Sequence, residues 1–122
     1  MTRAVRDAGV PPRDVAVPAG TPDAALGTAV AAEVARLAER YDGGSVGVVA
    51  PRERLAHLGT AVDGVPVLST SEAKGLEWDA VVVVDPDGIA AEPRGWNGLY
   101  VAMTRCTQEL ARVTVRAPSG RV

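Results

Sequence analysis

The sequence predicts an α/β domain with a mainly parallel sheet, because short apolar runs alternate with helical segments along the chain. The clearest strand spans residues 80–85, where four consecutive valines precede a Pro-Asp-Gly turn signal, a pattern that predicts a strand buried on both faces of a parallel sheet. The clearest helix follows Thr21-Pro22-Asp23, which combines a hydroxyl cap, a proline at the first helical position and a first-turn acid. Strands that alternate with helices form right-handed crossovers, and these crossovers connect parallel neighbours.

The N-terminal half continues this pattern. Residues 1–20 contain three prolines and are expected to form a partly irregular extension with a short strand at residues 15–17. The helix that follows ends at Asp42-Gly43-Gly44, and its apolar face consists of Leu26, Val30, Val34, Leu37 and Tyr41. Its charged residues, Glu33, Arg36, Glu39 and Arg40, fall mostly on the other faces. The next expected elements are a buried strand at 46–50, a short helix from Pro51 and a short strand at 65–68.

The C-terminal part is predicted as a loop, a helix and a strand. Residues 89–97 contain a proline and a glycine and are expected to form the loop. Residues 96–107 are expected to be helical, and residues 111–115 alternate apolar and polar side chains like an edge strand with one wetted face. The expected domain organisation is an N-terminal extension over 1–20, one domain over 21–116 and a tail over 117–122.

Composition limits the function without identifying it. A chain of 122 residues forms one domain, and a net charge of −2 gives no bulk electrostatic reason to bind nucleic acid or an anionic membrane. One cysteine and one histidine provide neither an intrachain disulfide nor a zinc site, so no metal site is expected. No run approaches the ~20 apolar residues of a membrane span and no signal peptide is evident, which favours a cytoplasmic location.

Two motifs carry the functional signal. Lys-Gly-Leu-Glu-Trp-Asp at residues 74–79 resembles the fifth motif of UvrD/Rep-like superfamily 1 motor ATPases. Leu-Tyr-Val-Ala-Met-Thr-Arg-Cys at residues 99–106 resembles the sixth motif of the same superfamily. Both motifs in the right order, separated by a valine-rich strand, are far more specific than either alone. Pro-Arg-Gly-Trp-Asn-Gly at residues 93–98 resembles the HelD branch, whose members act on bacterial RNA polymerase.

This resemblance implies a three-layer RecA-like domain of the P-loop NTPase type, the C-terminal motor domain called 2A in a UvrD/HelD-type helicase or translocase. In that family ATP and Mg²⁺ bind at an N-terminal P-loop domain. The sequence contains no Gly-x-x-x-x-Gly-Lys-Ser/Thr, so this chain alone is expected to be inactive although the parent protein is an ATPase. The implied partners are that P-loop domain and either RNA polymerase, as in HelD, or single-stranded DNA, as in UvrD.

The resemblance also assigns residues. Arg105 matches the sixth-motif arginine, which contacts the ATP γ-phosphate in the family, and a planar guanidinium suits phosphate oxygens. Apart from the motif, Arg105 would be a surface arginine paired with Glu109. Glu77 matches the glutamate that contacts the ribose, and Gly75 permits a tight turn and close approach of the backbone. The candidates for a nucleic-acid or interdomain contact are Ser69, Ser71, Lys74 and Thr104.

Several features leave other functions open. Ser69 and Ser71 replace the Thr and His that helicases carry at these positions, which weakens a prediction of DNA translocation. A second hypothesis is therefore a degenerate, non-catalytic motor domain that binds protein or nucleic acid. A third, ranked last, is a stand-alone NTPase that uses Asp85, since the strand before it looks like a Walker B strand. Three further residues are expected to be structural: Trp78 and Trp96 pack in the interior, and Cys106 is a small apolar helix residue.

Overall fold

The computed structural model describes residues 12–18, 20, 22–62, 64–93 and 95–116. Within these residues, five strands form one sheet in the order β1-β5-β4-β2-β3, and every neighbouring pair is parallel. The strands are β1 (Arg13–Pro18), β2 (Val46–Val49), β3 (Val67–Leu68), β4 (Trp78–Val84) and β5 (Cys106–Arg116). The predicted α/β class with a parallel sheet is therefore confirmed.

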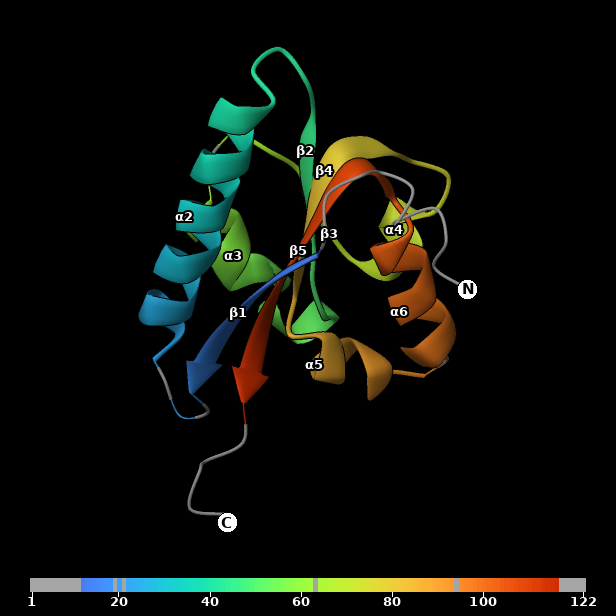
Figure 1. Cartoon of the computed structure of the whole chain (residues 1–122). Helices are drawn as coiled ribbons and strands as arrows, with labels where there is room; N and C mark the ends of the chain where they lie inside the picture. Colours follow the sequence, from blue (N-terminus) through green and yellow to red (C-terminus); the bar gives the residue numbers. More distant parts are fainter. Residues whose placement is uncertain (1–11, 19, 21, 63, 94, 117–122) are drawn as a thin grey trace.

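Helices cover both faces of this sheet and make three layers (Figure 1). One face is covered by α2 (Asp23–Arg40) and by α3 (Leu55–Ala61), which follows the 3₁₀ turn η1 (Arg52–Arg54). The other face carries α4 (Thr70–Ala73), α5 (Pro86–Ala90) and α6 (Gly95–Met103). The predicted cap Thr21 lies outside the described residues, and Pro22 is the residue that precedes α2.

Strand β4 is the centre of the sheet and of both hydrophobic layers. Its residues from Ala80 to Val84 have no exposed surface, which confirms the prediction of a strand buried on both faces. Val82 faces a cluster that includes Val30 and Leu37 of α2, whereas Val81 faces a cluster built around α5 and α6. The predicted apolar face of α2 is likewise buried, with Tyr41 at its edge partly exposed.

The connection between β4 and β5 differs from the predicted loop. Asp85 adopts a left-handed backbone conformation, with φ of 53°, and its carboxylate accepts a hydrogen bond from the Gly88 N–H at 3.2 Å. This cap, followed by Pro86 at the first helical position, starts α5 in a segment that was predicted to be a turn and loop. Helix α6 ends at Met103, so Arg105 follows the helix instead of lying within it.

The outer strands also differ from the prediction. The alternating residues 111–115 belong to the 11-residue strand β5, which lies between β1 and β4 and is therefore an inner strand. The edge position belongs to β1, which pairs with β5 from Arg13 to Pro18 and extends the strand predicted at residues 15–17. The first strand of the sheet thus lies before residue 21, which is the residue at which the sequence predicts that the domain starts. The polar face of β5 is explained by pairing, since Arg112 binds the β1 carboxylate of Asp14 at 2.7 Å.

The central packing of α2 predicts a large cost for truncating Leu37, which has no exposed surface. We expect Leu37→Ala to lower the free energy of unfolding by about 2–5 kcal/mol, because it removes buried methyl groups and leaves a cavity. Leu76→Ala is the matched control, since Leu76 is 45% exposed, and we expect a change within about 0.5 kcal/mol. Urea denaturation followed by circular dichroism measures both values, and equal losses would contradict the described core.

Candidate nucleotide-contact site

The two sequence motifs meet where β4 and β5 begin. These strands are adjacent and parallel, so the residues that precede them lie at the same end of the strands. The Trp78 N–H donates a hydrogen bond to the Arg105 carbonyl oxygen at 2.9 Å, which joins the first motif directly to the second. The structure therefore brings Arg105 next to the turn that contains Gly75 and Glu77.

The Arg105 guanidinium is held by three uncharged acceptors. Its Nε donates to the Val101 carbonyl at 3.2 Å, and its two terminal nitrogens donate to the Leu76 carbonyl and the Thr104 hydroxyl, each at 3.5 Å. The alternative pairing with Glu109 is wrong, because Glu109 pairs with arginines of α2. The acceptors orient the guanidinium without neutralising its charge, and this leaves the cation available to an anion.

Thr104 completes the end of α6. Its hydroxyl donates to the carbonyl oxygens of Tyr100 at 2.9 Å and Val101 at 3.1 Å, which also accept from the Thr104 N–H at 3.1 and 3.2 Å. The same hydroxyl accepts the hydrogen bond from Arg105. Thr104 thus links the end of the helix to the arginine, and it reaches Arg105 instead of projecting away from it.

The turn before β4 presents Gly75 and Glu77 on the surface. Gly75 has φ of +83°, a conformation that strains any residue with a Cβ, and a Cβ built there would meet nothing within 4 Å. Its glycine is therefore explained by backbone conformation. Glu77 and Lys74 are exposed on either side of this turn. Glu77 has an acceptor-only carboxylate suited to hydroxyl donors, and its contact with a ribose stays a prediction.

Ser69 and Ser71 have different surroundings. Ser69 is buried and forms a capping box at α4: its hydroxyl accepts from the Glu72 N–H, and the Glu72 carboxylate accepts from the Ser69 N–H. The hydrogen bond from the Ser69 N–H lowers the pKa of Glu72. Ser71 is exposed, and its hydroxyl lies 3.5 Å from a terminal nitrogen of Arg52. Ser-x-x-Glu is the sequence signature of a capping box, and it is the signal from which α4 could have been predicted.

A groove of about 280 Å³ separates α4 from α6. Its lining residues are Thr70, Ser71, Lys74, Pro93, Asn97, Gly98 and Val101. Among the described residues, the lining includes one cation and no carboxylate, and it contains two of the predicted contact residues, Ser71 and Lys74. Ser69 and Thr104 do not belong to this lining, so the four candidates for a nucleic-acid or interdomain contact do not form one surface.

The two tryptophans have opposite roles. Trp78 is 8% exposed and packs over Gly47 of β2, where a Cβ would lie 2.5 Å from the indole ring. Its predicted place in the core is confirmed. Trp96 is 76% exposed on α6, so the prediction that it packs in the interior is wrong. The buried residues of α6 are Gly95, Leu99 and Ala102, which share one face at helical spacing, and Trp96 lies outside that face.

Asp85, at the opposite end of β4, is fully used by the fold. One carboxylate oxygen pairs with Nε of Arg54 at 2.9 Å, and the other accepts the Gly88 N–H. Within the described ranges, no group of three or more His, Cys, Asp or Glu side chains is placed to hold a metal ion. Asp85 is therefore held by an ion pair and as the cap of α5.

The fold and the site around Arg105 together define a class of protein. It is an α/β domain with a parallel sheet that presents an arginine where two adjacent inner strands begin. The family described as the UvrD-like helicase C-terminal domain matches residues 64–112, which contain both motifs. This finding confirms the resemblance to UvrD-like helicases for that segment, and the HelD branch stays a prediction. None of the described helices is both long and apolar enough to cross a membrane.

A solved structure has a similar fold. It is the crystal structure of the C-terminal domain of a possible DNA helicase from Lactobacillus plantarum WCFS1. The two chains superpose with a TM-score of 0.65 at 20% sequence identity, over 97% of this chain and 88% of that chain. At this identity the match supports the fold. A comparison with curated proteins finds no significant match.

The reactivity of Cys106, the one cysteine of the chain, tests whether the end of the second motif is buried in the fold. Cys106 begins β5, is 5% exposed and packs in the cluster beneath α6, so burial raises the pKa of its thiol. A raised pKa means less thiolate near pH 8, and we expect the folded chain to react with an aromatic disulfide about tenfold or more slowly than the urea-unfolded chain. Absorbance of the released thiolate measures both rates. Equal rates would contradict the placement of Cys106 inside the fold.

Proposed function

We propose that this chain is the C-terminal motor domain of an ATP-dependent superfamily 1 helicase or translocase of the UvrD type. In this role Arg105 contacts the γ-phosphate of ATP bound, with Mg²⁺, at an N-terminal P-loop domain of the same protein. The observation that supports the proposal most directly is the uncompensated guanidinium of Arg105, oriented by three neutral acceptors at the junction of the two motifs.

The chemistry fits phosphoryl transfer. Negative charge spreads over the transferred group in the transition state, and a fixed cation that costs no rearrangement stabilises it. Val101, Leu76 and Thr104 fix Arg105 before a ligand arrives, and they leave its charge unpaired. Glu77 lies in the same exposed turn as Gly75, which has a left-handed backbone, and its carboxylate can accept a hydrogen bond from a ribose hydroxyl. In this role the chain supplies the positive charge of Arg105 to a nucleotide bound by another domain.

We further propose the HelD branch, with RNA polymerase as the partner, on the basis of Pro-Arg-Gly-Trp-Asn-Gly at residues 93–98. Such a protein would work in the cytoplasm. A second candidate is a degenerate motor domain that binds protein or nucleic acid without catalysis. The exposed indole of Trp96 favours that candidate, because single strands bind by stacking their bases on exposed aromatic side chains.

The role of Arg105 is tested in the full-length protein. We expect Arg105→Ala to lower kcat for ATP hydrolysis by about 10³-fold, as removal of an arginine finger does elsewhere. Arg105→Lys is the matched variant: it keeps the charge but loses the planar fork, so a large part of the loss should remain. Circular dichroism controls for folding, and the 122-residue chain alone is expected to give no phosphate release. A rate within about twofold of wild type for Arg105→Ala would overturn the proposal.

The partner is tested by two assays on the same full-length protein. We expect immobilised RNA polymerase core to retain it, and we expect affinity for single-stranded DNA to be weak and to fall steeply with salt, since phosphate contacts release counterions. A strand-displacement assay with ATP measures unwinding directly. Robust unwinding without retention on polymerase would reject the HelD assignment and leave a UvrD-type helicase, with Trp96→Ala then expected to weaken DNA binding.

A further inference from the structure

We infer that Glu109 is a positioning residue for Arg105, and that it acts by holding a β-bulge between the two residues. The inference rests on the proposed function of Arg105, but it also makes a claim about the chain itself that can be measured without activity. It concerns a cluster of buried charges on the face of the sheet opposite to α6.

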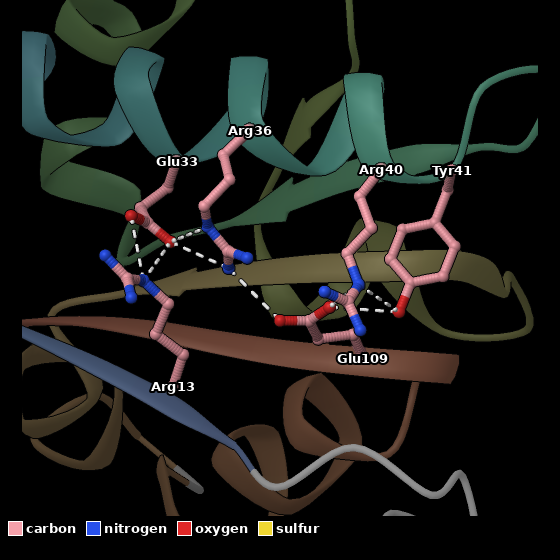
Figure 2. Close-up of polar contacts among 6 residues, drawn as sticks. All are labelled: Arg13, Glu33, Arg36, Arg40, Tyr41 and Glu109. Carbon is pink, nitrogen blue, oxygen red and sulfur yellow. Dashed lines mark hydrogen bonds and ion pairs between the residues drawn. The ribbon is translucent and has the colours of Figure 1, made fainter.

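The cluster connects α2 to the two strands beneath it (Figure 2). Glu109 of β5 is 3% exposed, and one of its oxygens accepts from Arg36 at 3.1 Å. Its other oxygen pairs with Nε of Arg40 at 3.0 Å and accepts from the Tyr41 hydroxyl at 2.9 Å. Glu33 of α2, 5% exposed, shares Arg36 and also binds Arg13 of β1 at 3.1 Å.

The bulge lies immediately after Arg105. On β4 the pairing advances two residues, from Trp78 to Ala80, while on β5 it advances three, from Cys106 to Glu109. Strand β5 therefore contains one extra residue in this segment. A bulge of this kind bends a strand and redirects the neighbouring side chains, and bulges are common beside active sites. Here its two ends are the Trp78–Arg105 hydrogen bond and the Ala80–Glu109 pairing.

The buried charges fix the bulge at this place. A strand can slip by one residue unless its side chains favour one register, and a slip turns every side chain to the opposite face. If β5 slipped, Glu109 would leave the α2 face, and Gln108 or Leu110 would stand opposite Arg36 and Arg40. Glu109 is the buried partner of these pairs, since the arginine side chains keep 31% and 51% of their surface exposed. A slip would bury its carboxylate away from both arginines, and an uncompensated buried charge is strongly destabilising.

The consequence reaches Arg105 through the backbone. Because two arginines of α2 and the tyrosine that follows the helix hold Glu109, the extra residue is confined between Cys106 and Glu109, and the Arg105 carbonyl stays on the Trp78 N–H. The guanidinium then remains at Leu76 and Val101. Glu33 is a natural comparison, because it is equally buried and shares Arg36, yet it lies on α2 and joins β1 instead of the bulge.

A first experiment uses the 122-residue chain and nuclear magnetic resonance. We expect Glu109→Gln to accelerate hydrogen exchange of the Trp78 amide by about tenfold or more, relative to core amides of β4 such as that of Val82. Glu33→Gln should leave this ratio within about twofold. If Glu109→Gln does not fold, Tyr41→Phe removes one of the bonds to Glu109 and should change the ratio in the same direction. An unchanged ratio, or an equal change in Glu33→Gln, would overturn the inference.

A second experiment uses the full-length ATPase and a double-mutant cycle. We expect Glu109→Gln to lower kcat about tenfold with the KM for ATP within about twofold, and Glu33→Gln to leave kcat within about twofold. In an Arg105→Ala background, Glu109→Gln should have no further effect on kcat, because it acts through Arg105. Equal losses in both backgrounds would overturn the inference alone, whereas an unchanged rate for Arg105→Ala would overturn the proposed function itself.

Discussion

The complete burial of β4 is the constraint on which the rest of the structure depends. From Ala80 to Val84 the strand exposes no side chain on either face, so it can carry polar chemistry only at its two ends. The end after Val84 is closed: the Asp85 carboxylate is shared by Arg54 and the Gly88 N–H. The end before Trp78 remains open to solvent. Because the middle of the strand is buried, the accessible polar groups beside it lie in the turn at Gly75–Glu77 and at the neighbouring Arg105.

This arrangement differs from that of a self-sufficient α/β enzyme. In open α/β sheets, ligands usually bind beyond the carboxyl ends of the strands. Here the carboxyl end of β4 is occupied by an internal ion pair, and the unpaired arginine stands at the opposite end. A domain built in this way presents the oriented Arg105 guanidinium at one end of the sheet and closes the carboxyl end of β4 with its own ion pair. That combination is what a domain needs if it completes a site held by another domain, and it argues against a stand-alone NTPase using Asp85.

Much of the fold could be predicted because its strongest patterns are local. Four valines define β4, apolar spacing defines α2, and each of the two motifs is a contiguous run of residues. The missed features depend on contacts distant in sequence. The alternation at residues 111–115 indicates a strand with a polar face, but only the pairing of Asp14 with Arg112 shows that β1 lies outside it. Helix α5 was missed because Pro-Asp-Gly also signals a turn, and the left-handed cap at Asp85 decides between them.

The buried carboxylates show the same limit at the candidate site. Glu33 was assigned to the polar faces of α2, since an isolated acid in a helix is normally solvated. Both Glu33 and Glu109 are nevertheless buried, because arginines pair with them. Glu33 pairs with one arginine of β1 and one of α2, and Glu109 pairs with two arginines of α2. Apolar side chains would fill the same volume without the desolvation cost. The contribution of these charges is therefore to select the register of β5 against α2. Arginines on α2 can donate to the β5 carboxylate in one register only, and this register places the bulge just after Arg105, where β5 begins.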